Sequence, residues 1–526
     1  MTTCQRRRFA AACLTGLVLS PFVLLHAAPQ PDEKDEELIV LSPFCVSASP
    51  GFGATVGGAQ DARYFREAVA DGDFPHPNTL TAEGLFGEHD LPLAVHTASK
   101  ERFFLTGEAM PAALLTKPEV KYLGQIGLAS GLDPATWRRE PLNLVAVVDK
   151  SGSMAGDLPL VKRCLHQILS QFGPDDQLSV VLYGDRSHVH LEPTRTNAAN
   201  RAAIAAAIDA IESEGSTNME EGLKVGFDLA RRSQAGFRGT TRVMQFTDER
   251  PNVGDTSAGG FMGLMQAASR DGIGQTTIGV GEQFGAELAA KISAVRGGNL
   301  FFFPDEAAML KTFTEELDTM VTELAHDLEV TIRPAAGLRL VGVYGIPGEM
   351  LEWRGERSVS FRISTVFLSR QKGAIYAAFA REDEDLPARR YAEGRPLATV
   401  KLSYRENGGR KVRAAELALP LVEAGERSVG LRRGQLLVSE YLGLKAAMTA
   451  HLTENNQEKA YGILDGLHQL LDTDRDPALD PERKLVGELH AKLAVLAGHG
   501  ETMPPTSAVA PATAEDEVIV LSGCYF

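Results

Sequence analysis

One aspartate and two serines lie within five residues, in the segment Asp149-Lys150-Ser151-Gly152-Ser153. This segment continues directly from Leu142–Asp149, an almost unbroken apolar run that is typical of a strand buried on both faces. Open α/β sheets place their ligands at the carboxyl ends of such strands. A single turning loop can therefore aim one carboxylate and two hydroxyl groups at one point, and Gly152 permits the tight backbone.

Two further oxygen donors follow at junctions between strands and helices. Thr217 lies in Gly215-Ser216-Thr217-Asn218, just before a helical pattern, and Asp248 ends the apolar run Arg242–Asp248. Hard oxygen ligands suit Mg²⁺, Mn²⁺ or Ca²⁺ better than zinc. The pattern therefore predicts a divalent metal site whose ligands are Asp149, Ser151, Ser153, Thr217 and Asp248.

The segment 141–325 alternates short apolar runs with helical patterns. Further strands are predicted at Gln177–Gly184, Gly274–Gly281 and Leu300–Phe303. Helical patterns lie at 158–172, 197–212, 219–233, 258–269, 285–296 and 305–325. This alternation predicts an α/β fold with a doubly wound, mostly parallel sheet flanked by helices. The run Ser187–Thr194, which holds His188 and His190, predicts an antiparallel edge strand rather than a zinc site.

These separated pieces resemble the metal-ion-dependent adhesion site of a von Willebrand factor type A domain. That family's pattern is Asp-x-Ser-x-Ser, then a Thr and then an Asp, in this order and at about this spacing. The resemblance covers 141–325 and implies a Rossmann-like fold. It implies that Ser151, Ser153 and Thr217 offer hydroxyl groups to the metal, while Asp149 and Asp248 act mostly through bound waters. The sixth position would take an acidic side chain of a partner.

The resemblance has one departure and one extension. Asp248 is followed by Glu249-Arg250-Pro251, where related bacterial proteins often have a glycine. Glu249 could bind the metal or block it, and Arg250 could recruit an acidic partner. The flanks, including Arg63-Tyr64-Phe65-Arg66 and Asp327–Pro334, resemble a bacterial subgroup with an N-terminal segment before this domain and a β-rich segment after it.

The rest of the chain divides by composition and period. Arg6, Arg7 and Arg8, an apolar stretch to about Leu25 and a small residue at Ala27 predict an export signal. The expected parts are a signal peptide at 1–27, a flexible acidic and Gly/Ser-containing lead at 28–60, an N-terminal associated segment at 61–140, the α/β domain at 141–325, a β-rich domain at 326–425, a helical region at 426–498, and a linker and tail at 499–526.

Charge and motifs exclude several function classes. The chain has 53 Lys and Arg against 69 Asp and Glu, a net charge of −16. Phosphates would be repelled, so a general nucleic-acid binder is not expected. No apolar run of membrane-spanning length follows the signal, so no stable membrane span is expected after its cleavage. No nucleophile elbow, phosphate loop or zinc-protease motif is present, so we expect no enzyme.

Two similar segments lie near the two ends of the chain. Glu37–Ser42 and Glu517–Ser522 each place four consecutive aliphatic residues behind acidic ones. Such segments are too short for a helix and suit strand addition to a sheet or to a partner.

The sequence thus predicts an exported protein of the periplasm, cell envelope or cell surface. It would bind a protein partner that presents an Asp or Glu to the metal. Two alternatives stay open: a metal-independent structural or assembly scaffold with a degenerate site, and an uncharacterised hydrolase.

Overall fold

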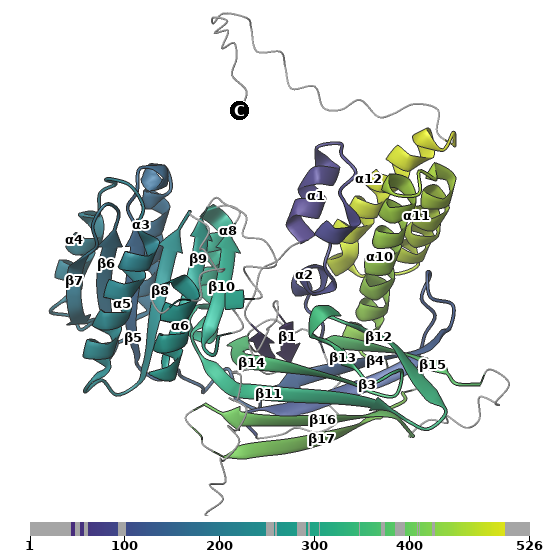
Figure 1. Ribbon diagram of the computed structural model, residues 1–526, viewed down its shortest axis with the longest axis horizontal. Coiled ribbons are helices and arrows are strands. Elements are labelled where there is room, and N and C mark those ends of the chain that lie inside the picture. The colour runs from purple at the N-terminus through teal and green to yellow at the C-terminus, as the bar shows by residue number, and fades with distance from the viewer. Residues whose placement is uncertain are drawn as a thin grey trace, which may run out of the picture. The chain divides into compact units, whose positions relative to one another are not determined.

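The computed structural model (Figure 1) describes residues 44–47, 53–56, 62–92, 101–248, 257, 260–280, 291–292, 295–303, 306–346, 348–369, 374–383, 395–407, 409, 411–422 and 427–499. The predicted signal peptide, both repeated end segments, and Glu249 and Arg250 lie outside these residues.

Six strands form the sheet that the apolar runs predict. In spatial order they are β10 (Gly298–Phe303), β9 (Ile273–Val280), β8 (Thr240–Thr247), β5 (Leu142–Asp149), β6 (Gln177–Tyr183) and β7 (His188–Arg195). Neighbouring strands are parallel except for the antiparallel pair β6–β7. The doubly wound, mostly parallel sheet and its antiparallel edge strand are therefore confirmed.

Helices cover both faces of this sheet (Figure 1). The helices are α3 (Leu158–Gln171), α4 (Arg201–Asp209), α5 (Met219–Gln234), α6 (Phe261–Arg270), α8 (Glu306–Glu315) and α9 (Leu317–Met320). Leu144 and Val148 of β5 pack with α3, α4, α8 and α9, whereas Val145 and Val147 pack with α5 and α6. Because successive side chains of a strand point to opposite faces, a strand covered on both sides is apolar throughout.

Helix α5 approaches the sheet closely at a glycine. A Cβ atom added at Gly222 would lie 2.6 Å from both Cγ and Cδ1 of Tyr183. The Tyr183 side chain is fully buried in β6, so it has little room to move.

We therefore expect Gly222→Ala to lower the free energy of unfolding of this domain by about 1–3 kcal/mol, because the added methyl group overpacks the core. Gly462→Ala is a matched control in α11 (Gln457–Asp472), because a Cβ there has no neighbour within 4 Å. The control should stabilise its helix by about 1 kcal/mol. Urea denaturation followed by circular dichroism would measure both, and equal effects would contradict the close packing.

The segments before and after this domain share one hydrophobic core. Strand β4 (Val120–Ala129), from before the domain, pairs with β15 (Ile375–Arg381), from after it, in a sheet of order β12-β15-β4-β3. The other two strands are β3 (Phe104–Pro111) and β12 (Leu338–Tyr344). A larger sheet has the order β1-β2-β14-β11-β16-β17, and β13 (Glu352–Trp353) pairs with β14.

The remaining elements of this second body are as follows. Its larger sheet contains β1 (Phe44–Ser47), β2 (Gly53–Val56), β14 (Val359–Ser369), β11 (Glu323–Pro334), β16 (Pro396–Glu406) and β17 (Val412–Pro420). Its helices are α1 (Ala62–Ala70), α2 (Ala82–Gly87), α10 (Val429–Leu452), α11 and α12 (Asp480–Leu496).

The structure differs from the sequence-based division at three places. The stretch expected to be a flexible lead, 28–60, contains the antiparallel hairpin β1–β2, and β2 pairs with β14. The segments expected as separate parts, 61–140 and 326–425, share a sheet through β4 and β15. The helical pattern expected over 305–325 ends earlier, because β11 begins at Glu323. Local periodicity does not show which distant strand completes a sheet.

No helix in the described part of the chain combines the length and the apolar character that a membrane span requires.

Candidate metal centre

Asp149 ends β5 with its side chain buried. Its Oδ1 accepts a hydrogen bond of 2.9 Å from the backbone N–H of Ser151, and its Oδ2 accepts one of 3.0 Å from the Thr247 hydroxyl. The first bond turns the chain back on the carboxylate, and the second crosses to the neighbouring strand β8. Both carboxylate oxygens are therefore held in fixed directions.

The two serines of the loop connect this carboxylate to the surface. The Oγ atoms of Ser151 and Ser153 lie 3.0 Å apart. Ser151 is buried, whereas Ser153 is exposed at the start of the short 3₁₀ helix Ser153–Ala155. A ligand that reaches Ser153 from solvent would thus lie close to the hydroxyl of Ser151.

The loop that carries Thr217 is tied to this first loop. The N–H of Gly152 donates to the carbonyl of Gly215 at 3.0 Å, and the N–H of Glu214 donates to the carbonyl of Lys150 at 2.6 Å. The backbone of Gly215 has a φ of +87°, a conformation that glycine adopts at little cost. Thr217 follows two residues later and is half-buried.

Asp248 follows β8 at the same edge of the sheet. Strands β5 and β8 are parallel with Val148 opposite Phe246, so the next residues, Asp149 and Thr247, lie side by side. Asp248 is the residue after Thr247 and is half-buried. Its charge contributes to a raised pKa of Asp157, after burial as the larger cause, so the two carboxylates lie near each other.

The structure thus brings the three predicted pieces to one edge of the sheet. Asp149, Ser151 and Ser153 share one loop with direct hydrogen bonds, and the loop of Thr217 is bonded to it. Asp248 follows the strand that binds Asp149 through Thr247. Glu249 and Arg250, whose roles the sequence leaves open, lie outside the described residues.

Sequence reasoning missed two residues of this site. The Thr247 hydroxyl donates to Asp149, and the buried Tyr183 hydroxyl also stabilises the charged form of that carboxylate. Thr247 had a visible signal, since it is a polar residue at the end of an apolar run next to a predicted ligand. Tyr183 had none, because a tyrosine at the end of a buried strand looks like core.

The electrostatics of Asp149 leave a charge without a basic partner. Burial raises the pKa of Asp149 above its ordinary value, and the hydrogen bonds from Ser151, Thr247 and Tyr183 oppose this shift. Among the described residues no Lys, Arg or His forms an ion pair with Asp149. The ammonium group of Lys150, the next residue in the chain, pairs instead with Glu214 at 2.8 Å.

The donor set fits a hard divalent cation. All five predicted ligands offer oxygen, two as carboxylates and three as hydroxyl groups, which suits Mg²⁺, Mn²⁺ or Ca²⁺. Within the described ranges, no group of three or more His, Cys, Asp or Glu residues is placed to hold a metal. The edge residue His190 is bonded elsewhere, since its Nε2 lies 2.8 Å from the carbonyl of Ala207.

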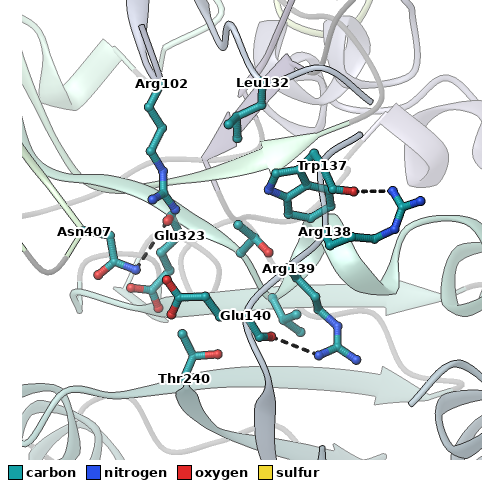
Figure 2. Close-up of a pocket in the computed structure, with 11 residues that line it drawn as sticks. Arg102, Leu132, Trp137, Arg138, Arg139, Glu140, Thr240, Glu323 and Asn407 are labelled. Atoms are coloured by element: carbon teal, nitrogen blue, oxygen red, sulfur yellow. Dashed lines mark hydrogen bonds between the residues drawn. The ribbon is translucent and has the colours of Figure 1, made fainter. Parts of the chain in front are cut away.

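A second polar site lies where the chain enters and leaves the α/β domain. A cavity of about 240 Å³ is lined by both connections, including Arg139 and Glu140 on the way in and Glu323 on the way out. Figure 2 shows Asn407 beside Glu323, whose main-chain oxygen accepts a 3.4 Å hydrogen bond from the Asn407 amide. Arg139 holds the incoming connection against the α/β domain, because it pairs with Asp176 and Asp318 at 2.7 Å each. None of the five predicted ligands lines this cavity.

Comparison with known proteins identifies the α/β domain. A family model, von Willebrand factor type A domain, matches residues 143–316. The chain contains a von Willebrand factor type A domain.

Two relatives each match about a third of the chain. The uncharacterized protein YfbK of Escherichia coli (strain K12) is 29% identical over 195 residues, which are 36% of this chain and 33% of the relative. The uncharacterized protein sll0103 of Synechocystis sp. is 31% identical over 184 residues, which are 35% of this chain and 42% of the relative. The chain therefore spans less than half the length of these two relatives.

Solved structures match the chain at low similarity. A von Willebrand factor type A structure from Catenulispora acidiphila is 15% identical and has a TM-score of 0.41, over 77% of this chain and 89% of that chain. Proximal thread matrix protein 1 from the mussel byssus, with a zinc-occupied MIDAS motif, is 22% identical with a TM-score of 0.28, over 33% of this chain and 44% of that chain.

The raised pKa of Asp149 predicts how charge at this position affects the von Willebrand factor type A domain. The folded state holds the Asp149 proton more tightly than the unfolded chain, so this group's contribution to stability falls as pH rises from the unfolded pKa through the folded one. At neutral pH the charge opposes folding. Asp149→Asn should therefore raise the melting temperature in EDTA and abolish the further rise that Mg²⁺ gives the wild type. Differential scanning fluorimetry at pH 7 would measure both, and a Mg²⁺-dependent rise in the variant would contradict the assignment.

Removal of the hydrogen bond from Thr247 should weaken metal binding less than Asp149→Asn does. Thr247→Val keeps the shape of the side chain but removes the hydroxyl that orients Asp149. We expect the Kd for Mg²⁺ or Mn²⁺, measured by calorimetry, to rise about 10- to 100-fold. Thr194→Val on β7 is a control, because the Thr194 hydroxyl donates only to the carbonyl of Glu192. An unchanged Kd for Thr247→Val would show that this bond does not orient the site.

Proposed function

We propose that this chain is an exported cell-envelope protein that binds a protein partner through a divalent cation. The cation would be held by Asp149, Ser151, Ser153, Thr217 and Asp248. The observation that carries the proposal is the buried carboxylate of Asp149, which three donors orient but which no described basic residue neutralises. A bound cation would supply the missing positive charge.

The five proposed ligands differ in charge. Ser151, Ser153 and Thr217 would offer neutral hydroxyl oxygens, so only Asp149 and Asp248 contribute charge. With mostly neutral oxygens in direct contact, the cation would keep enough positive charge to accept an acidic side chain in a charge-assisted bond. The exposure of Ser153 supports access for that side chain from solvent.

A binding role also agrees with what the sequence lacks. The sequence has no nucleophile elbow, phosphate loop or zinc-protease motif, so the function we propose is non-enzymatic. The export of the chain rests on the basic and apolar start of the sequence, from Arg6 to Ala27. Magnesium is the cation we propose, and Mn²⁺ or Ca²⁺ would use the same oxygen ligands.

The test is capture of a partner with and without metal. The mature protein is immobilised as wild type, as Asp149→Asn and as the control Thr194→Val, and envelope extract is passed over each in Mg²⁺ or in EDTA. We expect at least one protein to bind the wild type and the control in Mg²⁺ only, and not to bind Asp149→Asn. That protein should lose binding when one of its own exposed Asp or Glu residues is replaced by Asn or Gln. Capture that persists in EDTA would favour the metal-independent scaffold.

A further inference from the structure

A cluster of charged side chains lies inside the second body, away from the metal centre. Its members are Arg66 of α1, Glu88 and His89 directly after α2, Glu440 of α10 and Glu482 of α12. We name these five residues the carboxyl cluster. It joins α1 and the end of α2, which precede the von Willebrand factor type A domain in sequence, to α10 and α12, which follow it.

Glu482 is the ionised centre of the carboxyl cluster. Its side chain is fully buried, and its two oxygens accept hydrogen bonds of 2.6 and 2.7 Å from Nη2 of Arg66. The buried His89 lies 2.7 Å away through Nε2. Burial alone would raise the pKa of Glu482, but the hydrogen bond from His89 and the charge of Arg66 outweigh it and bring the pKa to about 2.

Glu440 is buried just as completely but has no donor of its own. Within the described chain, neither of its carboxyl oxygens accepts a hydrogen bond from a protein donor. Its carboxyl group faces that of Glu482 at hydrogen-bonding range. Two carboxylates cannot bond to each other, because neither carries a hydrogen. One proton on Glu440 turns the same contact into a short O–H···O⁻ bond, which is among the stronger hydrogen bonds in proteins.

We propose that Glu440 is a neutral carboxylic acid that donates its proton to Glu482, and that this proton fastens α1 and α2 to α10 and α12. Loss of the proton leaves a second carboxylate against Glu482, and only one guanidinium group and one imidazole face the two. Like charges in a buried site repel strongly. As pH rises through the pKa of Glu440, the contact therefore opens and the attachment of the N-terminal helices to the C-terminal ones weakens.

The other charged groups around Glu440 do not offset this repulsion. Glu88 adds a further acid, and its Oε2 lies 2.8 Å from Nη2 of Arg66, so it competes for the same guanidinium group. Glu83 of α2 also lies against α10, where it acts on Tyr441 and Lys445. Among the described residues, three acids besides Glu440 thus lie near Arg66, His89 and Lys445, so an ionised Glu440 would have to share Arg66 with Glu482 and Glu88.

The direction of the pH dependence follows from the same contacts. Burial first, and then the charge of Glu482, raise the pKa of Glu440 well above its ordinary value. The folded protein therefore keeps a proton that the unfolded chain loses, and stability from this group is full below the unfolded pKa and falls as pH rises toward the folded one. Glu482 acts in the opposite sense, since its contribution is lost only as pH falls toward about 2.

Infrared spectroscopy tests the proton directly. In D₂O at neutral pH, the full-length wild type should show a carbonyl band of a protonated carboxylic acid that is absent from Glu440→Gln. Glu488→Gln is a matched control on the half-exposed side of α12 and should keep the band. Identical spectra for the wild type and Glu440→Gln would overturn the proposal.

Hydrogen exchange tests the fastening of α1. In the wild type, the equilibrium constant for opening amides 62–70, corrected for the intrinsic exchange rate, should rise about tenfold for each pH unit across the range where Glu440 loses its proton. In Glu440→Gln, whose amide can donate to Glu482 at every pH, that constant should stay flat. The wild-type measurement stands even where the variant fails to fold. A flat wild-type profile from pH 6 to the start of global unfolding would overturn the proposal.

Discussion

A carboxylate that must stay buried fixes the arrangement around the metal centre. Strand β5 is covered on both faces, so its last residue, Asp149, ends inside the protein rather than in water. A buried charge is costly unless hydrogen bonds and an opposite charge meet it. Thr247 from the next strand and the backbone of Ser151 supply the bonds. These residues supply no opposite charge. The loop of Thr217 is bonded to the loop that follows Asp149, so Thr217 could add a ligand to a cation bound there.

The α/β domain was largely predictable because each of its elements is encoded locally. An unbroken apolar run indicates a strand with helices on both sides, and Leu142–Asp149, Gln177–Tyr183 and Ile273–Val280 are such strands. The less apolar run Ser187–Thr194 indicated an antiparallel edge strand, and β7 pairs antiparallel with β6. The five candidate ligands could be named because strand ends in a parallel sheet meet at one edge. The pattern of strands does not identify the metal that these residues bind or the partner protein.

The second body was less predictable because its sheets are completed by distant segments. Strand β4 pairs with β15, about 250 residues further along the chain, with Ile126 opposite Ile375. A short alternating run shows that a strand forms but not which strand pairs with it. The hairpin β1–β2 was missed for a related reason, since Gly53–Val56 is a weak strand sequence that gains its stability by pairing with β14. The Glu440 contact was equally hidden, since a lone glutamate in a long helical pattern gives no sign of burial.

Both bodies bury carboxylates, but they balance them in different ways. Glu482 is paired with Arg66 and lies 2.7 Å from His89, and both residues are parts of the fold that stay in place once it has formed. Asp149 has no such fixed partner among the described residues, and its loop reaches solvent through Ser153. With its partners fixed, the proposed contact of Glu482 with Glu440 can change only through the proton on Glu440. The charge of Asp149 would instead be balanced by a cation that exchanges with solvent. If both proposals hold, pH would control how the N- and C-terminal segments are joined, and divalent cations would act separately on the von Willebrand factor type A domain.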